Sequence, residues 1–303
     1  MQRETPITKA LARVLMAAAW TQGSLQESEA DALKDLLFQL PALNESDWEE
    51  LQELLDKPVS SRRAERYQRE FSALLAGEGA LTFAAYAVER VTGTGSGAGA
   101  PPEAKTVEQI RTCIGQSGDD ALLCMYQLIE EPLHERRQAD EHEQLHRLSE
   151  TQTFLDERMG GILAGDWPQP LSPEELRRLS LAGILLSFVI HADERIDENE
   201  ILTAEKYLCE AWGLTEEKAQ FVVQVSLSDR IEGIDLMRVC RWFYEATSEE
   251  ERIGFLEVLF DVGIADGALD DREIDIIMLI AADLRFDQHH FQAALERVLA
   301  ANS

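Results

Sequence analysis

Basic residues are scarce in this chain. It has 28 lysines and arginines against 57 aspartates and glutamates, which gives a formal charge of -29 at neutral pH. A field of this sign repels nucleic acid and anionic lipid, and it favours cations and basic protein surfaces. We therefore expect no nucleic-acid partner. The same composition is also typical of a very soluble acidic protein that binds no ligand.

Long apolar segments are absent as well. The longest one, residues 179–190, covers about 12 residues and is interrupted by two serines, whereas a membrane-spanning helix needs roughly 20. This run is interpreted as a buried helix, and we expect no direct insertion into a membrane. The first residues also lack the pattern of a signal peptide.

Cysteines are few and widely spaced: Cys113, Cys124, Cys209 and Cys240. No pair of them has the spacing of a metal-binding or redox motif. The last three lie in apolar helical segments, where a free thiol behaves as a small hydrophobic side chain. We therefore expect free thiols and a cytoplasmic protein, because the cytosol is reducing.

No stretch shows the sustained alternation of a β-strand, and helix signals are frequent instead. Ser172-Pro173 places a capping serine before a proline in the first helical position. Ser248 is followed three residues later by Glu251, which is the spacing of a capping box. These starts, together with the stops between them, predict about seven helices over residues 173–300. The expected fold is an all-α bundle.

Composition divides the chain into four parts. Residues 1–91 are predicted to form a first helical domain, and residues 92–106, rich in glycine, serine and proline, are predicted to be a flexible linker. Residues 107–170 are interpreted as polar connecting helices with a break at Pro132. Residues 171–303 are predicted to form a second helical domain.

Two acidic hairpins in the second domain are the main functional signal. In one of them an apolar helix ends at Ala265, and a second helix begins after a short turn. Three carboxylates lie across that turn at relative positions 0, +4 and +7, and the pattern occurs twice. The residues are Asp193, Asp197 and Glu200 in the first hairpin, and Asp266, Asp270 and Glu273 in the second.

Two interpretations of these hairpins remain open. The second aspartate and the glutamate of each have capping-box spacing, which is worth about 1 kcal/mol and needs no ligand. Asp193 and Asp266, however, directly follow a helix C-terminus, where the dipole disfavours an anion by roughly 0.3–1 kcal/mol. Three carboxylates on one turn also repel each other unless a cation lies among them. Oxygen ligands suit Ca²⁺, Mg²⁺ or Mn²⁺.

The N-terminal region repeats the hairpin pattern without its acids. When residues 22–29 are laid on the second hairpin, Gly23 and Glu29 fall where Gly267 and Glu273 are, but glutamines replace the two aspartates. Residues 78–81 echo the same turn. Residues 7–91 are therefore interpreted as a degenerate copy of the C-terminal domain that has lost the acidic cluster.

A different motif is His142-Glu143-Gln144-Leu145-His146. Two histidines four residues apart share one face of a helix and can hold Zn²⁺, with Glu143 as a general base and Asp166 as a third ligand. Such a site would make the chain a zinc metalloprotease. The charged neighbours instead favour a solvated helix, because a metalloprotease helix is buried.

Residues 173–300 resemble the TerB family of tellurite-resistance proteins and, more distantly, the N-terminal domain of DjlA-type co-chaperones. The residues that carry the resemblance are 192–200 and 265–273. It implies an all-α domain without catalytic activity, and a divalent metal site formed by the six acidic residues above. Glu194 stands where the family usually has glycine, so the first turn is expected to differ in shape.

The resemblance also implies a role. The family is tied to tellurite and chemical-stress responses through a membrane-associated metal-sensing complex, so partners are expected among basic or membrane-associated stress-response proteins. The protein would then be peripheral at the inner membrane through such a partner. The alternative is an acidic co-chaperone-like or scaffold module whose hairpins are purely structural and whose surface binds a basic protein.

Overall fold

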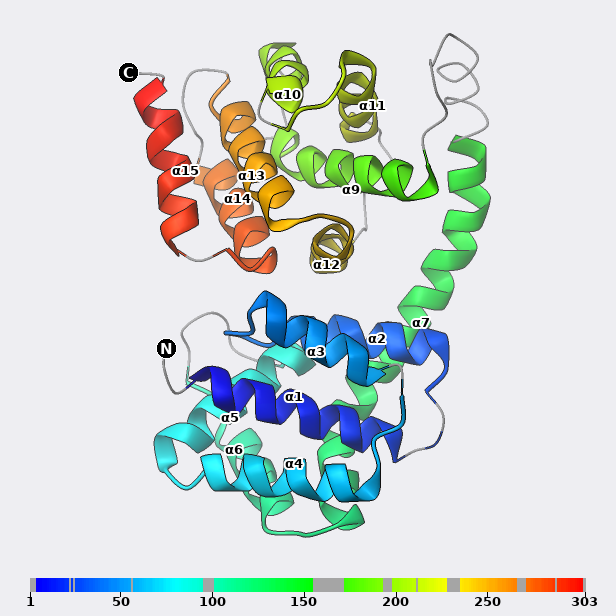
Figure 1. The fold of residues 1–303 in the computed structure, drawn as a ribbon, viewed down its shortest axis with the longest axis vertical. Coiled ribbons are helices and arrows are strands. Elements are labelled where there is room, and N and C mark those ends of the chain that lie inside the picture. The colour runs from blue at the N-terminus through cyan, green and yellow to red at the C-terminus, as the bar shows by residue number, and fades with distance from the viewer. Residues whose placement is uncertain are drawn as a thin grey trace. The chain divides into compact units, whose positions relative to one another are not determined.

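The fold is described from a computed structural model. The residues that it describes are 4–21, 23, 25–55, 57–94, 101–154, 172–192, 198–210, 212–227, 235–265, 271–286 and 288–301. Within the helices, the description leaves out the side chains of residues 139–154 and 198–200, among others. Over these ranges the chain forms helices and no strand, which confirms the predicted all-α class (Figure 1).

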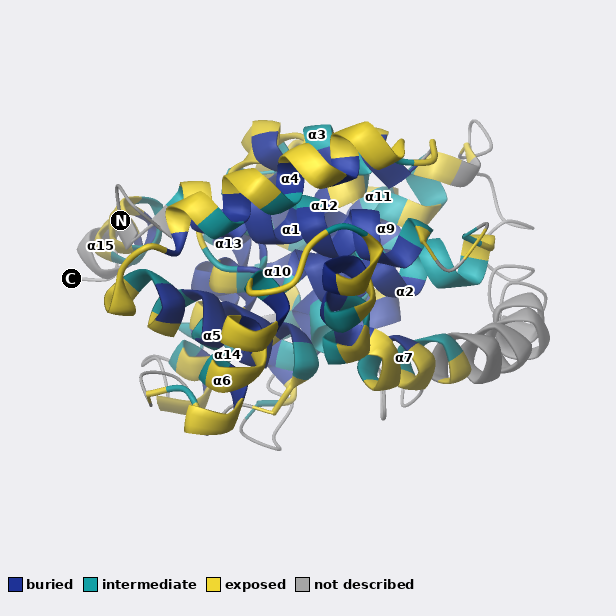
Figure 2. Ribbon diagram, turned by 90° about the horizontal axis from the view of Figure 1, so that it is seen from below, coloured by how far each residue is buried: buried dark blue, intermediate teal, exposed yellow. Residues whose placement is uncertain are grey.

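The chain divides into two compact units, Met1–Asp156 and Glu157–Ser303. The helices of the N-terminal unit are α1 Glu4–Trp20, α2 Glu27–Phe38, α3 Glu45–Leu55, α4 Ser61–Leu74, α5 Glu78–Thr92, α6 Ala104–Ile114 and α7 Asp119–Phe154. The central helix is α1, which packs against α3, α4, α5 and α7. Its side chains Leu11, Leu15 and Met16 are fully buried, and the buried colour follows α1 in Figure 2.

Ion pairs connect α1 to α3 and α4. Lys9 Nζ lies 2.6 Å from Asp47 Oδ1 and 2.8 Å from Glu50 Oε2, both on α3. Arg13, one turn later, pairs with Glu50 and approaches Glu70 on α4 at 3.8 Å. Burial raises the pKa of Glu50, but the hydrogen bonds from Lys9 and Arg13 outweigh this and lower it overall.

Helices α6 and α7, which lie in the segment expected to connect two domains, belong to the N-terminal unit. Helix α6 packs on α5 and α7, and α7 packs on α1 and α2. The reason is an apolar stripe at helical spacing, because Leu122, Met125, Ile129 and Leu133 are all buried. The expected linker also ends in a fixed contact, since the backbone N–H of Glu103 donates a 2.7 Å hydrogen bond to the buried carboxylate of Glu89.

Helix α7 continues through Pro132, where the sequence predicted a break. A proline inside a helix removes one backbone donor and usually bends the helix. Here Ile129 and Leu133, on either side of the proline, are 0% and 2% exposed. Their packing keeps both sides of Pro132 on the same surface, so the helix is not interrupted.

Two of the four cysteines, Cys113 and Cys124, form a disulfide, contrary to the expectation of free thiols. Their Cα atoms are 5.3 Å apart, which is an ordinary separation for a disulfide. The pair was not recognisable as a motif, because it arises when α7 folds back on α6. Cys209 and Cys240 are free, and burial raises the pKa of the Cys240 thiol.

Over its described residues, the C-terminal unit has seven helices, in line with the number predicted for residues 173–300 from helix starts and stops. They are α9 Pro173–Ile190, α10 Glu198–Glu210, α11 Glu216–Ser226, α12 Leu236–Ala246, α13 Glu249–Gly263, α14 Asp271–Asp283 and α15 Gln288–Ala301 (Figure 1). The expected apolar run of residues 179–190 forms most of α9, which packs against α11, α12, α13 and α14.

A close helix contact at Gly183 lies at the centre of this unit. A Cβ atom added there would stand 2.6 Å from Val225 Cβ and 2.7 Å from the carbonyl oxygen of Val222 on α11. Glycine therefore lets α9 and α11 approach more closely than any other residue would allow. As for membranes, none of the described helices combines the length and the apolar character needed to cross one.

Candidate functional site

The two acidic turns lie between helix ends that the structure defines. Helix α9 ends at Ile190 and α10 begins at Glu198, while α13 ends at Gly263 and α14 begins at Asp271. Most of the predicted ligands fall outside the described residues: Asp193, Asp197, Asp266 and Asp270. Glu200 belongs to the first turn of α10, but its side chain also falls outside the description.

Glu273 is the predicted ligand whose side chain the structure describes. It is the third residue of α14 and is only 4% exposed. Asp271, in the same first turn, is exposed. The two carboxylates therefore face different surroundings, and Glu273 points toward the interior beside the second acidic turn. Burial of a carboxylate is unfavourable unless donors or a cation compensate it.

Each of the two hairpins packs its second helix on the first helix of the other hairpin. Helix α10, which follows the first turn, packs on α13, which precedes the second. Helix α14, which follows the second turn, packs on α9, which precedes the first. Helices α9 and α13 also contact each other. The two hairpins thus form one interlocked group of helices rather than two independent ones.

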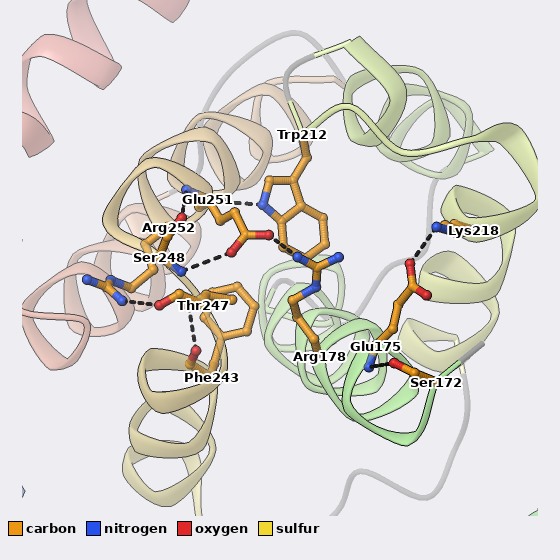
Figure 3. Close-up of polar contacts among 10 residues, drawn as sticks. All are labelled: Ser172, Glu175, Arg178, Trp212, Lys218, Phe243, Thr247, Ser248, Glu251 and Arg252. Carbon is orange, nitrogen blue, oxygen red and sulfur yellow. Dashed lines mark hydrogen bonds and ion pairs between the residues drawn. The ribbon is translucent and has the colours of Figure 1, made fainter. Parts of the chain in front are cut away.

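A polar cluster joins α9 and α13 through their N-terminal parts, shown in Figure 3. Arg178 of α9 pairs with the carboxylate of Glu251 on α13. The same carboxylate accepts a 2.9 Å hydrogen bond from the backbone N–H of Ser248, and the Ser248 hydroxyl accepts one of 3.2 Å from the N–H of Glu251. The predicted capping box is therefore present, and its glutamate also pairs with an arginine of the neighbouring helix α9.

Trp212, in the connection between α10 and α11, completes this cluster. Its indole N–H donates a 2.8 Å hydrogen bond to the carbonyl oxygen of Glu251 (Figure 3), and the guanidinium of Arg178 lies 5.8 Å from the ring centroid. The ring packs against Phe243 and Phe255 at 6.0 and 5.2 Å. One residue thus ties the end of the first hairpin to the start of the second.

The sequence indicated only part of this cluster. The capping box is readable from Ser248 and Glu251 because they are three residues apart. Arg178 lies 73 residues away from its partner Glu251, so no local pattern could connect the two. Trp212 lies 39 residues from Glu251, so its hydrogen bond was not foreseeable from the sequence.

The remaining candidates add no described metal site. His191 was expected to pack at the end of α9, and its Nδ1 lies 2.9 Å from the carbonyl oxygen of Ser187. His142 and His146 lie one turn apart on α7, but their side chains and Asp166 are outside the described residues. Where side chains are described, no group of three or more His, Cys, Asp or Glu residues is arranged to hold a metal ion.

Comparison with known proteins gives one match. The family model of the tellurite resistance protein TerB matches residues 179–296. This segment runs from the first buried turns of α9 into α15, so it includes both acidic turns and the helices that carry them. No curated protein and no solved structure is detectably similar to the chain. The C-terminal unit of this all-α protein therefore contains a TerB domain, detected over residues 179–296.

Proposed function

We propose that the C-terminal unit is a non-enzymatic metal-binding module that acts in the response to tellurite or chemical stress. In this proposal a divalent cation, Ca²⁺, Mg²⁺ or Mn²⁺, is held by oxygen ligands from the two acidic turns. The proposed ligands are Asp193, Asp197, Glu200, Asp266, Asp270 and Glu273.

The burial of Glu273 is the observation that carries this proposal. A carboxylate that only caps a helix needs no burial, since its hydrogen bond to the backbone forms equally well at the surface. Glu273 is 4% exposed although it begins a helix next to a turn with two further aspartates. In this proposal the buried carboxylate of Glu273 is one oxygen ligand, and the sequence puts two further acids, Asp266 and Asp270, within seven residues of it.

The packing of the helices supports the proposal in a second way. Because each hairpin packs its second helix on the first helix of the other, the described helices that flank the two turns belong to one packed group. The Arg178–Glu251–Trp212 cluster holds α9 and α13 at fixed positions. A cation site assembled from two turns needs such a frame, because metal ligands must stay within a few tenths of an ångström of their positions.

Titration calorimetry with CaCl₂, MgCl₂, MnCl₂ and ZnCl₂ tests the proposal. We expect one of the first three cations to bind the wild type. Binding should be lost in the double variant Asp193→Ala with Asp266→Ala, and strongly weakened in Glu273→Gln. The matched control is Asp271→Asn, which removes an exposed carboxylate from the same turn of α14. The metal proposal fails if no cation binds, or if Asp271→Asn weakens binding as much as Glu273→Gln.

A second candidate function follows from the charge of -29. The protein would then be an acidic co-chaperone-like or scaffold module that binds a basic protein, including one at the inner membrane, with hairpins that serve only folding. The two candidates differ in their response to a chelator. Binding of a basic partner that depends on salt but is unaffected by EDTA would favour the scaffold, whereas loss of binding with EDTA would favour a metal-dependent contact.

A further inference from the structure

Helix α4 departs sharply from the acidic character of the chain. Residues 57–74, from just before α4 to its end, contain five basic and two acidic residues, in a chain with twice as many acids as bases. Four of these basic residues form what we call the arginine stripe: Arg62, Arg63, Arg66 and Arg69. All four are exposed, and they recur at helical spacing along one side of α4, where exposed positions are yellow in Figure 2.

The arginine stripe is anchored on a buried aromatic ring. Tyr67 is 3% exposed, and the guanidinium groups of Arg13, Arg63 and Arg66 lie 5.7, 5.9 and 5.4 Å from its ring centroid. Stacking on a ring restricts the rotamers of an arginine and leaves its planar donor face available. These side chains are therefore partly ordered in advance for binding a carboxylate.

An open groove continues from the stripe between α1 and α4. Its volume is about 700 Å³. Apolar surface is contributed by Pro6, Ala10, Ala73 and Leu74, and the side chain of Leu74 is 39% exposed. Arg13 lines this α1–α4 groove and also stacks on Tyr67, so the groove and the arginine stripe form one continuous surface.

Glu70 shows how this surface holds a carboxylate. Its Oε1 lies 3.6 Å from Nε of Arg66, and its Oε2 lies 3.8 Å from Nη1 of Arg13. The side chain is 46% exposed and lines the groove. Glu70 thus places a carboxylate between two guanidinium groups beside an apolar groove. A partner would meet this chemistry first at Arg62, Arg63 and Arg69, and then compete with Glu70 for the other two.

We propose that the arginine stripe and the α1–α4 groove form a docking site for an acidic protein segment with an apolar anchor residue. Carboxylates of the segment pair with the arginines, and the anchor side chain enters the groove. The argument is charge complementarity. Exposed arginines next to apolar surface attract an acidic partner, although the chain as a whole carries an excess of acids.

The other polyanions fit this surface less well. A nucleic acid or an anionic membrane presents many charges over a long distance, and the net charge of -29 repels both beyond the stripe. A short peptide extends little beyond the four arginines. Neither a phosphate backbone nor a lipid headgroup supplies the apolar side chain that the groove accommodates.

Fluorescence anisotropy with designed peptides tests the docking site. The probe is a short labelled helical peptide with glutamates on one face and leucines at i, i+4 spacing. Two comparison peptides replace the glutamates by lysines or the leucines by alanines. The full-length protein is used as wild type, as Arg63→Glu with Arg66→Glu, as Glu70→Gln and as Arg111→Glu. Arg111 lies on α6, is exposed and pairs with Glu108, so Arg111→Glu is the control for a charge reversal outside the stripe.

The expected results differ in sign between variants. We expect the Arg63→Glu with Arg66→Glu variant to weaken binding about tenfold or more, because two pairs are lost and two repulsions added. Glu70→Gln should strengthen binding about threefold, since it removes the internal competitor. Arg111→Glu should leave the affinity unchanged, and both comparison peptides should bind more weakly. Circular dichroism and melting temperature of each variant confirm that the fold is kept.

Three outcomes would overturn the docking proposal. The first is equal weakening by Arg111→Glu, which would show a general charge effect. The second is equal binding of the leucine-free peptide, which would exclude the groove. The third is tighter binding of poly-uridine RNA or phosphatidylserine vesicles than of the acidic peptide, which would assign the arginines to a different class of partner.

Discussion

In the N-terminal unit the central helix α1 is held by lysine and arginine side chains that pair with acids on α3 and α4. In the C-terminal unit the central helix α9 is held by a glycine contact with α11 and by the Arg178–Glu251–Trp212 cluster. The ion pairs of both units lie in partly exposed positions, where such pairs contribute little, so the difference lies in the close glycine contact of α9. The comparison indicates that α9 is fixed by close packing and α1 mainly by its apolar side.

The turn before α2 and the turn before α14, which were expected to be copies, also differ in how far their glutamates are buried. In the N-terminal unit Gln26 precedes α2, and its backbone N–H donates a 3.5 Å hydrogen bond to Glu29, which is half-buried. At the corresponding place in the C-terminal unit, Glu273 is buried. Glu29 caps a helix although glutamines at positions 22 and 26 replace the two aspartates of the hairpin pattern, so capping alone does not require the acidic cluster of the C-terminal turns. That the two units are copies remains a prediction, because the family match covers only residues 179–296.

The largest expected effect concerns the disulfide, which belongs to the N-terminal unit. The double variant Cys113→Ser with Cys124→Ser opens a loop closed across 11 residues. The free energy of unfolding of this unit should fall by about 3 kcal/mol, because the unfolded chain gains entropy. Hydrogen exchange followed by mass spectrometry should show faster exchange in α6 and α7. Protection of α9 and α13 should not change, and neither should any region in the control Cys209→Ser.

The next effect tests the close packing of α9. Gly183→Ala places a methyl group 2.6 Å from Val225 Cβ and 2.7 Å from a backbone oxygen, so α9 or α11 must shift. We expect a loss of about 1–3 kcal/mol in urea unfolding of the C-terminal unit. Gly79→Ala in α5 is the matched control, since nothing lies within 4 Å of its added Cβ. Equal stability of the two variants would mean that α9 and α11 are not in close contact.

A smaller effect is expected at the capping box. Glu251→Gln removes the ion pair with Arg178 and weakens the bond to the Ser248 N–H. The cost should be about 1 kcal/mol, accompanied by a change in Trp212 fluorescence at neutral pH. Glu250→Gln removes an exposed charge from the same turn and should have no effect. If both substitutions cost the same, the charge of the first turn matters rather than the contact with α9.

The smallest expected effect is a difference between Glu50 and Asp261 in how their contributions to the free energy of unfolding depend on pH. Hydrogen bonds lower the pKa of Glu50 despite its partial burial, so its contribution is present above pH 4.5 and is lost as the pH falls through its folded-state pKa. Burial raises the pKa of Asp261 on α13, despite a 3.1 Å hydrogen bond from Arg297 on α15. The contribution of Asp261 to stability therefore depends on pH in the opposite direction: it is present at low pH and is lost as the pH rises through the folded-state pKa of Asp261.

Urea unfolding between pH 3 and 7 separates these two groups. Glu50→Gln should remove a stabilisation that the wild type has at neutral pH, and the difference should vanish in acid. Asp261→Asn should flatten the pH dependence of the C-terminal unit, with the larger change at neutral pH. A difference between Glu50→Gln and wild type that grows as the pH falls would contradict the assigned sign.

Much of the fold was readable from the sequence, and particular residues show why. Ser172 with Pro173 and Ser248 with Glu251 mark helix starts through contacts within three residues, and both starts were confirmed. The break predicted at Pro132 was wrong, because burial of Ile129 and Leu133 outweighs the local preference of proline. The acidic turns were recognisable as a pattern, yet nothing in their spacing indicated that Glu273 would be buried.

By itself, the sequence determined the helical class, several helix starts and the pattern of the acidic turns, because apolar periodicity and capping depend on residues a few positions apart. Only the tertiary structure decided that α6 and α7 belong to the N-terminal unit, that Cys113 meets Cys124, and that Arg178 meets Glu251. It also brought Arg13 of α1 beside the arginines of α4. These contacts join helices through packing, and packing depends on the shape of the whole unit rather than on any local pattern.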